Sequence, residues 1–352
     1  MKLATFARGG ARRVGLVEVG DAPGSGIVYP FGVGLTMRDV IDAGLDAAAR
    51  LAQRARESEP VPLESVRLLP PLRPASVRDC VAFAEHVEGV RRSVDGATGE
   101  GADLVPDAWY DAPTFYFTNP HAIYGPGDAV PFPARSRARD FELEVAVIVG
   151  APGTSLSEEQ AREHVFGYTI MNDWSDRDLQ SREMQVRLGP AKGKDFATSL
   201  GPWIVTADEF DGHRDADDFL DLWCSVDVNG ERVGEDLLSN VGWTFEAMIA
   251  YASRDSRVLV GDVIGSGTTG NGGCLAELWG RRGAQDPPPL VDGDVVTLTV
   301  EGLGSLTNTV TSAPPTPALG GPRRRDPASA RAARAGDARP FADPTPERTE
   351  EH

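Results

Sequence analysis

One short run constrains the fold more than any other part of this sequence: residues 140–150 read DFELEVAVIVG. Alternate side chains of a β-strand share a face, so one face carries Glu142 and Glu144 and then turns apolar, while the other face is apolar throughout. Apolar residues on both faces are typical of a strand inside a sheet that is covered on both sides. The sequence therefore predicts a central, buried strand with two carboxylates about 7 Å apart at one end.

These two glutamates need a positive charge nearby, because an unpaired carboxylate in an apolar interior carries a large desolvation cost. Carboxylate oxygens two residues apart on a strand suit a hard divalent cation such as Mg²⁺, Mn²⁺ or Ca²⁺. Alternatively, the strand lies at the edge of a sheet and both glutamates are solvated. The run by itself leaves both interpretations open.

The segment TIMNDWSDRDLQ (169–180) supplies a second acidic position. Asp173 directly follows an apolar run that is typical of a strand, and Arg177 and Gln180 come soon after it. A carboxylate at a strand end can complete a metal shell, and the nearby Arg and Gln can donate hydrogen bonds to an anionic substrate. Alternatively, Asp173 or Ser175 caps the N-terminus of a helix.

The two internal lysines lie in one loop, GPAKGKDFAT (189–198), and the only other lysine is Lys2. The loop lacks the glycine spacing and the Ser or Thr of a phosphate-binding loop, so nucleotide binding is disfavoured. A lysine in a Gly/Pro-rich loop can instead supply a compact positive charge to a developing oxyanion. Lys192 and Lys194 are therefore both candidates for this role.

Two further segments carry candidate groups. In DCVAFAEH, Asp79 precedes His86 by seven residues, although a lone histidine is more often structural than catalytic. The glycine-rich segment GSGTTGNGGC (265–274) indicates either a backbone that approaches a ligand or a simple turn between two strands.

Composition excludes several classes of function. The chain has 53 Asp and Glu against 35 Lys and Arg, a net charge of −18, which argues against nucleic-acid partners and anionic membrane surfaces. Its apolar runs are too short to span a bilayer. The three cysteines are odd in number and widely spaced, and the N-terminal segment shows no apolar signal region. We therefore expect a cytoplasmic protein without disulfides.

The pattern of apolar residues divides the chain into three parts. Residues 1–70 indicate a small N-terminal α/β module with two paired strands and a helix over 37–53. Residues 71–310 carry many short strands, few helices and an Asn-Gly hairpin turn at 229–230. This predicts a mixed α+β fold, mainly β, with a rolled or barrel-like core. Residues 311–352 are rich in Pro and Arg and poor in apolar side chains, so we expect a disordered tail.

Taken together, six segments resemble the fumarylacetoacetate hydrolase family: RDCVAFAEH, FELEVAVIVG, MNDWSDRDLQ, LGPAKGKDFATSLGPWIV, GWTFEAMIAYAS and GSGTTGNGGCLAELWG. Their order and spacing carry the resemblance, which covers about residues 67–304. It implies the β-roll catalytic core of that family, one divalent metal (Mg²⁺ first, with Mn²⁺ or Ca²⁺ as alternatives) and a homodimer.

The resemblance also implies roles for individual residues. The implied metal ligands are Asp79, Glu142, Glu144 and Asp173. The implied catalytic residues are His86 and Glu277, which activate water, and Lys194, Arg177 and Gln180, which stabilise an enolate. The implied substrate contacts are Tyr116 and Thr268. Relative to the family pattern, one residue is inserted before the lysine loop, and if this insertion shifts the alignment, Lys192 takes the place of Lys194.

Three departures from the family pattern qualify the resemblance. Val81 and Met184 stand where the family has aromatic residues, so the substrate is expected to differ from fumarylacetoacetate. The smaller-subunit branch of the family takes its glutamate from the third residue after the histidine, which is Gly89 here. Glu277 therefore favours the arrangement found in fumarylacetoacetase.

The sequence thus predicts a metal-dependent hydrolase that cleaves a carbon–carbon bond of a β-diketo acid of the acylpyruvate type. The alternative is a decarboxylase, isomerase or hydratase of 2-oxo-alkenoic acids, because these reactions need the same enolate stabilisation. A metal-binding scaffold without catalysis is a third, less favoured interpretation. In every case the expected partner is a small 2-oxo acid.

Overall fold

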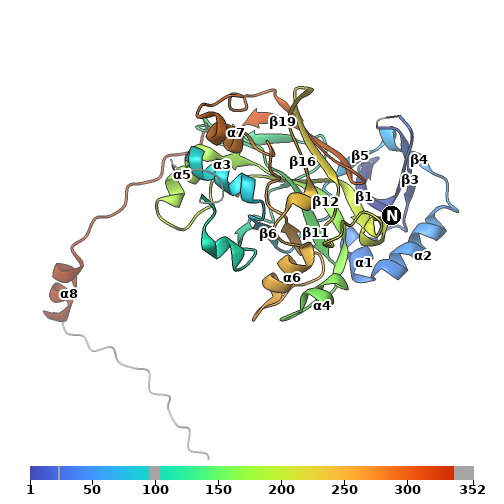
Figure 1. Ribbon diagram of the computed structural model, residues 1–352, viewed down its shortest axis with the longest axis horizontal. Coiled ribbons are helices and arrows are strands. Elements are labelled where there is room, and N and C mark those ends of the chain that lie inside the picture. The colour runs from blue at the N-terminus through green and yellow to red at the C-terminus, as the bar shows by residue number, and fades with distance from the viewer. Residues whose placement is uncertain (23, 95–103, 337–352) are drawn as a thin grey trace, which may run out of the picture. The chain divides into compact units, whose positions relative to one another are not determined.

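The computed structural model describes residues 1–22, 24–94 and 104–336. Residues up to Pro315 form one compact unit, and Thr316 begins a second. The first unit contains a 12-stranded sheet, a five-stranded sheet and a two-stranded ribbon (Figure 1). The described part of the second unit contains one short helix.

Ten strands of the large sheet lie in the order β4 (Val61–Pro62), β3 (Gly26–Pro30), β2 (Ala11–Val19), β1 (Lys2–Arg8), β14 (Thr198–Thr206), β12 (Val165–Asp173), β11 (Leu143–Val149), β17 (Val263–Gly265), β6 (Val77–Cys80) and β7 (Phe115–Thr118). Off this path, β5 (Arg67–Leu69) pairs with β1, and β8 (Ile123–Tyr124) pairs with β14.

The smaller sheet has the order β16 (Glu231–Leu237), β15 (Trp223–Val228), β18 (Val295–Val300), β19 (Gly304–Ser312) and β9 (Ala129–Phe132), and the ribbon pairs β10 (Arg139–Asp140) with β13 (Ser175–Asp176). The predicted mixed α+β fold, mainly β, is confirmed. Over the described residues both sheet paths have two free ends, so the core is rolled rather than closed into a barrel.

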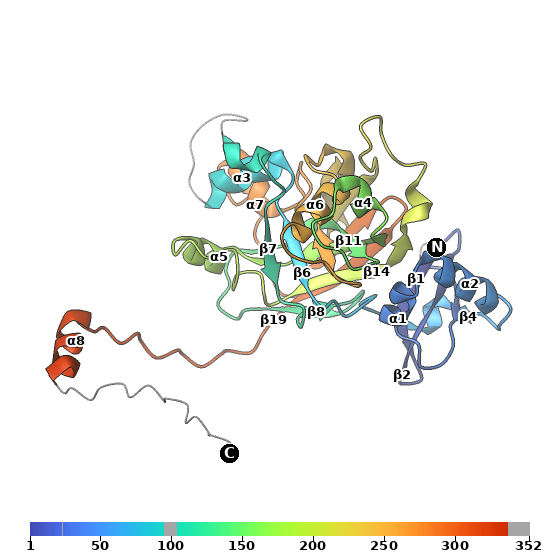
Figure 2. The same ribbon diagram turned by 90° about the horizontal axis from the view of Figure 1, so that it is seen from below.

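The helices are α1 (Met37–Asp42), α2 (Leu45–Ala55), α3 (Ala84–Val94), α4 (Glu158–Arg162), α5 (Arg177–Met184), α6 (Phe245–Ser253), α7 (Leu275–Arg282) and α8 (Pro327–Gly336). Helices α3 and α7 lie side by side in both views (Figure 2). Among the described residues, we find no helix whose length and apolar character would let it cross a membrane.

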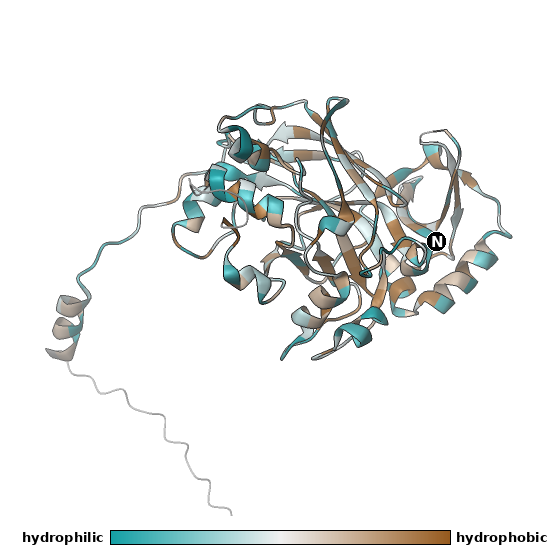
Figure 3. Ribbon diagram, in the orientation of Figure 1, coloured by the Kyte–Doolittle hydropathy of each residue, from teal (hydrophilic) through white to brown (hydrophobic). Residues whose placement is uncertain are grey.

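Strand β11 is the centre of the large sheet. It pairs antiparallel with β12 on one side and with β17 on the other, and all seven of its residues are buried. Val145 and Val147 pack in one hydrophobic cluster, whereas Ala146 and Ile148 pack in a second. The hydrophobic colouring of the central strands reflects this burial (Figure 3). The prediction of a strand covered on both faces is therefore confirmed, and the edge-strand alternative is wrong.

The N-terminal segment follows its predicted elements with one change. Strands β1 and β2 pair as expected, but the single helix expected over 37–53 is divided into α1 and α2. Gly44 lies at the division with a φ of +81°. A right-handed helix cannot continue through this backbone conformation, and residues other than glycine rarely adopt it. Strand β1 also pairs with β14, with Leu3 opposite Ile204, so the N-terminal strands continue the sheet of the core.

Two other local predictions can be compared with the structure. The Asn-Gly turn joins β15 to β16, and Asn229 and Gly230 both have positive φ, as a type I′ hairpin requires. Strand β19 extends to Ser312 because Thr311 and Ser312 pair with β9, so the first two residues of the expected tail belong to the sheet. Helix α8 also lies within that expected tail.

Helices α3 and α7 cross at two glycines. A Cβ atom on Gly280 would lie 1.9 Å from the carbonyl oxygen of Gly89, and a Cβ atom on Gly89 would lie 2.5 Å from Cγ of Glu277. The two backbones are therefore in direct contact. This contact matters for the site because α3 carries His86 and α7 carries Glu277.

We predict that Gly280→Ala destabilises the protein. Alanine gains up to about 1 kcal/mol in helix propensity. The new methyl group, however, would meet a backbone oxygen that cannot turn aside, and such overpacking costs about 1–3 kcal/mol or more. Urea unfolding should show a net loss of stability. Gly212→Ala is the control, because that Cβ meets nothing within 4 Å. Equal stability of Gly280→Ala and the wild type would contradict the contact.

Candidate metal centre and catalytic pocket

Four buried carboxylates meet at one end of the central strands. Asp79 comes from β6, Glu142 immediately precedes β11, Glu144 lies at the start of β11, and Asp173 ends β12. One ligand atom from each residue lies within 4.8 Å of the others, and each residue is at most 3% exposed. The structure therefore brings together the complete set of metal ligands that the sequence predicted.

A glycine in the intervening strand allows this approach. Gly265 of β17 lies between β11 and β6, opposite Ala146 and Asp79. A Cβ atom on Gly265 would lie 2.6 Å from Oε2 of Glu144 and 2.8 Å from Oδ1 of Asp79. The first glycine of the segment GSGTTGNGGC is thus needed because two carboxylates occupy the space above its Cα.

The donor set fits a hard divalent cation. Oδ1 of Asp79 and Oδ1 of Asp173 are buried without a hydrogen-bond partner. Burial raises the pKa of Asp79, Glu144 and Asp173, since a desolvated carboxylate favours its protonated form. A divalent cation among these oxygens would satisfy the orphaned atoms and offset the burial of negative charge. This cluster can therefore hold such an ion.

Lys194 supplies the resident positive charge of the cluster. Its Nζ lies 2.5 Å from Oδ2 of Asp173 and 2.6 Å from Oε2 of Glu142, and the residue is 2% exposed. Burial would lower the pKa of Lys194, but the two carboxylates outweigh burial and raise it, so the lysine stays charged. Lys192 instead lies at the surface and pairs with Asp195 at 2.8 Å. Lys194, not Lys192, therefore lies in the pocket.

Arg177 and Gln180 join the cluster from α5. Nη2 of Arg177 lies 2.7 Å from Oε1 of Glu142, and Nη1 donates to Oε1 of Gln180 at 2.9 Å. Burial alone would raise the pKa of Glu142, but Lys194 and Arg177 hold it below its ordinary range. The cap of α5 is Asp176, which accepts from the Leu179 amide, so the alternative that Asp173 or Ser175 caps this helix is wrong.

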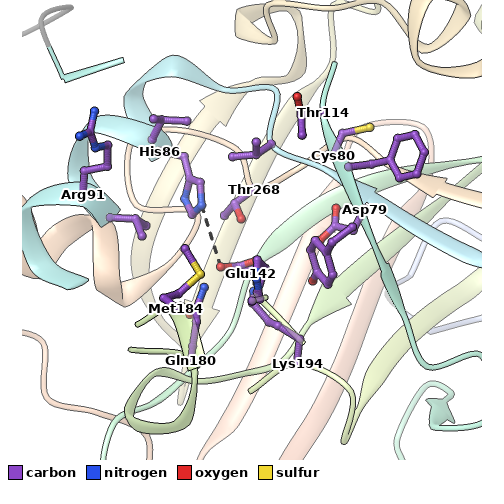
Figure 4. A pocket seen from close by; sticks show the side chains of 17 residues that line it. Asp79, Cys80, His86, Arg91, Thr114, Glu142, Gln180, Met184, Lys194 and Thr268 are labelled. Atoms are coloured by element: carbon purple, nitrogen blue, oxygen red, sulfur yellow. Dashed lines mark ion pairs between the residues drawn. The ribbon is translucent and has the colours of Figure 1, made fainter. Parts of the chain in front are cut away.

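His86 projects from α3 toward the carboxylates. Its Nε2 lies 4.0 Å from Oε1 of Glu142 (Figure 4). Its Nδ1 lies 3.6 Å from Sγ of Cys274. Burial lowers the pKa of His86 to about 4, since the imidazolium is poorly solvated there. The imidazole is therefore neutral at pH 7 and able to accept a proton.

Glu277 is fully buried, and among the described residues no hydrogen bond or ion pair joins it to His86. Its Oε1 lies 2.6 Å from Nη2 of Arg281 and accepts from the Gly272 amide at 3.3 Å, while Oε2 has no hydrogen-bond partner. Burial raises the pKa of Glu277 to about 7, although Arg281 acts in the opposite direction. The expected histidine–glutamate pair is thus near but not formed in this conformation.

Some of the groups described above line one cavity of about 320 Å³, whereas Glu144, Asp173, Arg177 and Glu277 are not among its lining residues. Tyr116 and Thr268 line it as predicted, and Tyr116 also donates a hydrogen bond to Oδ2 of Asp173 at 2.5 Å. Val81 and Met184, which replace family aromatics, form part of its wall. The predicted site residues that line the cavity are Asp79, His86, Tyr116, Glu142, Gln180, Lys194 and Thr268.

Sequence reasoning missed three residues that organise this site: Asp140, Cys274 and Arg281. Each contacts a segment that is more than 100 residues away in the chain. No local spacing signals these long-range contacts. Two local signals were present: Asp140 shares the strand parity of Glu142, and Arg281 follows Glu277 by four residues, the spacing of an ion pair on one helix face.

Comparison with known proteins identifies the family. A family model described as the C-terminal part of fumarylacetoacetate (FAA) hydrolase matches residues 76–311, which is more than half of the chain. The chain belongs to the fumarylacetoacetate hydrolase family. The match includes every predicted metal ligand and catalytic residue, so the resemblance inferred from six segments is confirmed.

Relatives in this family of enzymes differ in activity. Fumarylacetoacetase from Oryza sativa subsp. japonica is 34% identical over 211 residues, 49% of each chain. Oxaloacetate tautomerase YisK from Bacillus subtilis is 31% identical over 199 residues, 56% of this chain and 61% of the relative. This chain thus spans about half to three fifths of these curated relatives. The solved fumarylacetoacetate hydrolase from Exiguobacterium antarcticum is 27% identical, with a TM-score of 0.68 over 89% of this chain and 100% of its own.

We predict that Lys194→Met lowers the free energy of unfolding of the metal-free protein. Removing one partner of a buried ion pair costs about 3–5 kcal/mol, because the remaining charges are left uncompensated. Lys192→Met is the matched control, since an exposed pair contributes about 0–1 kcal/mol. Urea unfolding of both variants at pH 7 tests the difference. A similar, small effect of both substitutions would contradict the central position of Lys194.

We predict that the stability of Glu277→Gln relative to the wild type rises with pH. The folded pKa of Glu277, about 7, lies above its ordinary value of 4.5, so ionising it costs stability as pH rises through this window. Glutamine removes that cost, by up to about 3 kcal/mol. Urea unfolding at pH 5 and pH 8 measures the change. Glu85→Gln is the control, because Glu85 also pairs with Arg281 but is exposed; the same pH trend in both variants would contradict the burial argument.

Proposed function

We propose that this protein is a metal-dependent hydrolase that cleaves the carbon–carbon bond of a β-diketo acid of the acylpyruvate type. One observation carries the proposal: a neutral, buried histidine faces a cage of four carboxylates that also holds a permanently charged lysine and arginine. This arrangement provides a proton acceptor on one side of the cavity and stabilisation for a negative charge on the other.

The proposed metal ligands are Asp79, Glu142, Glu144 and Asp173. When bound, Mg²⁺, or Mn²⁺ or Ca²⁺ in its place, would polarise the carbonyl oxygens of a 2-oxo acid substrate. Mg²⁺ is the first choice from the resemblance to the family, since Mg²⁺, Mn²⁺ and Ca²⁺ all bind carboxylate oxygens. The family membership and the orphaned carboxylate oxygens support this assignment.

His86 is the proposed general base. Its neutral imidazole would take a proton from water as that water attacks the distal carbonyl carbon, a contribution of about 10²–10⁴-fold. Glu277 would orient this water or the imidazole through Oε2, the oxygen that has no partner in the structure. That role requires Glu277 to be ionised, which its raised pKa restricts to neutral and higher pH.

Three side chains would stabilise the enolate that carbon–carbon cleavage leaves. The ammonium of Lys194 and the guanidinium of Arg177 are already fixed by Glu142, so they need little reorganisation during the reaction. Gln180, hydrogen-bonded to Arg177, adds an amide group on the same wall. Tyr116 and Thr268 are the proposed substrate contacts, because both line the cavity.

A second candidate function is isomerisation of a 2-oxo acid, as in the related oxaloacetate tautomerases. One observation favours it: Glu277 pairs with Arg281 rather than with His86, so the water-activating pair is not assembled in this conformation. An isomerase needs the enolate-stabilising wall but no attacking water. Decarboxylase or hydratase activity on 2-oxo-alkenoic acids is the related alternative, and a scaffold without catalysis is the least favoured.

The proposed partner, cellular location and oligomeric state follow from the net charge and from the resemblance to the family. The partner is a small 2-oxo or β-diketo acid, and we propose neither nucleic acid nor a membrane surface as a partner, because the chain carries a net charge of −18. A cytoplasmic homodimer that acts in catabolism agrees with the resemblance to the family. Gel filtration with light scattering would test the dimer.

A substrate screen tests the proposed function. We expect chelator-treated protein to be inactive and Mg²⁺ or Mn²⁺ to restore turnover of an acylpyruvate, with pyruvate and a carboxylic acid as products. Loss of the enol absorbance of oxaloacetate without cleavage would instead identify an isomerase. Undiminished turnover in the metal-free protein would exclude the metal mechanism.

His86→Ala separates the general base from the metal site. We expect this variant to lose about 10²–10⁴-fold in hydrolysis, because no other proton acceptor replaces the imidazole. It should still bind Mn²⁺ in a calorimetric titration, since the proposed ligands are all carboxylates. Full hydrolytic activity of the variant would place the general base elsewhere.

A further inference from the structure

Asp140 is a fully buried carboxylate that neither lines the cavity nor belongs to the four-carboxylate cluster. It ends β10, two residues before Glu142. Its Oδ1 accepts from the amides of Phe141 and Leu275, each at 2.8 Å. Its Oδ2 accepts from the Ala276 amide at 2.9 Å and from Nε and Nη2 of Arg177 at 2.9 and 2.7 Å. Five donors thus converge on one side chain.

Two of these donors belong to the first turn of α7. The first amides of a helix have no partner within it, and they carry a partial positive charge that favours an anion. Asp140 accepts from the first two, Leu275 and Ala276, and Sγ of Cys274 accepts from the third, Glu277, at 3.4 Å. Asp140 therefore fixes where α7 begins. Cys274, which contacts His86, immediately precedes that point.

The second carboxylate oxygen of Asp140, Oδ2, also binds the guanidinium of Arg177. Nε and Nη2 both face Oδ2 of Asp140, which restricts the rotation of the planar group. The same Nη2 also lies 2.7 Å from Oε1 of Glu142, and Nη1 donates to Gln180. The position of Arg177 relative to the carboxylate cluster thus depends on Asp140.

We propose that Asp140 is a positioning residue that fixes the two sides of the catalytic pocket relative to each other. One side is α7 with Cys274 and Glu277, next to His86. The other side is Arg177 with Gln180, next to Glu142. The inference rests on the proposed function for its kinetic part, but the mechanical link between α7 and α5 is a property of the chain itself.

A second buried aspartate provides a matched control. Asp262, directly before β17, pairs with Arg78 of β6 at 3.1 Å and is 4% exposed, so the two form a buried ion pair. It also accepts from the Leu259 amide. Among the described residues, its hydrogen-bond and ion-pair partners lie outside α5 and α7 and do not line the cavity. A purely structural contribution should therefore be similar for Asp140→Asn and Asp262→Asn.

Hydrogen exchange tests the link without a substrate or a metal. In Asp140→Asn the amide group offers one acceptor where two carboxylate oxygens served five donors. We expect faster exchange in peptides covering α7 and α5, with no such change in Asp262→Asn. Unchanged exchange in both helices would overturn the link. This experiment requires no turnover, so its result would stand even if the proposed function were wrong.

Kinetics with the substrate found for the wild type test the positioning role. We expect Asp140→Asn to lower kcat by about 10²-fold, because small misplacement of reacting groups has effects of this size. KM should change much less, and Mn²⁺ affinity, measured by electron paramagnetic resonance, should be retained. An undiminished kcat, or a parallel loss of Mn²⁺ affinity, would overturn the proposal.

Asp140→Glu separates position from charge. It keeps the ion pair with Arg177 but moves the carboxylate by one methylene, so we expect it to be more stable than Asp140→Asn and still low in kcat. Full recovery of kcat by this variant would show that charge alone matters and would overturn the positioning role. Failure of both variants to fold, while Asp262→Asn folds, would assign Asp140 to stability and overturn it as well.

Discussion

The burial of four carboxylates away from solvent is the constraint on which the rest of this structure depends. Asp79, Glu142, Glu144 and Asp173 lie at the end of central strands, where isolated negative charges are strongly disfavoured. Lys194 and Arg177 offset part of that charge, and the remaining oxygens suit a divalent ion. The same imbalance that makes the metal-free cluster costly suits the cluster to hold a divalent cation.

The fold supplies the rigidity that such a cluster needs. Strand β11 carries Glu144, directly follows Glu142, and is covered on both faces by separate hydrophobic clusters. The neighbouring strand β12 carries Asp173, and β6, which lies beyond β17, carries Asp79, so the separation of these residues is set by backbone pairing. His86 lies outside the sheet, on α3, which packs against α7, and α7 is linked to the carboxylates through Asp140 and Arg177. The pocket is thus a rigid wall faced by a pair of helices.

Sequence reasoning predicted what depends on local periodicity and on motif order. The alternation in 140–150 indicated the central strand and two metal ligands, and the Asn-Gly pair indicated a hairpin. It could not decide between Lys192 and Lys194, because the direction of a side chain in a loop depends on tertiary contacts. It missed Asp140 because the partners of that residue lie in segments far away in the sequence. It joined α1 and α2 because the apolar pattern continues across Gly44.

The glycine crossing of α3 and α7 has a consequence for how the substrate range of such an enzyme can change during evolution. Gly89 contacts α7, whereas Val87 and Val90 of the same helix line the cavity. The backbone contact fixes the helix, so substitutions at the two valines can reshape the cavity without displacing His86. Divergence of substrate preference is thereby separated from conservation of the chemical step. This separation gives a physical reason why the shape of the cavity can vary on one scaffold while the position of His86 is kept.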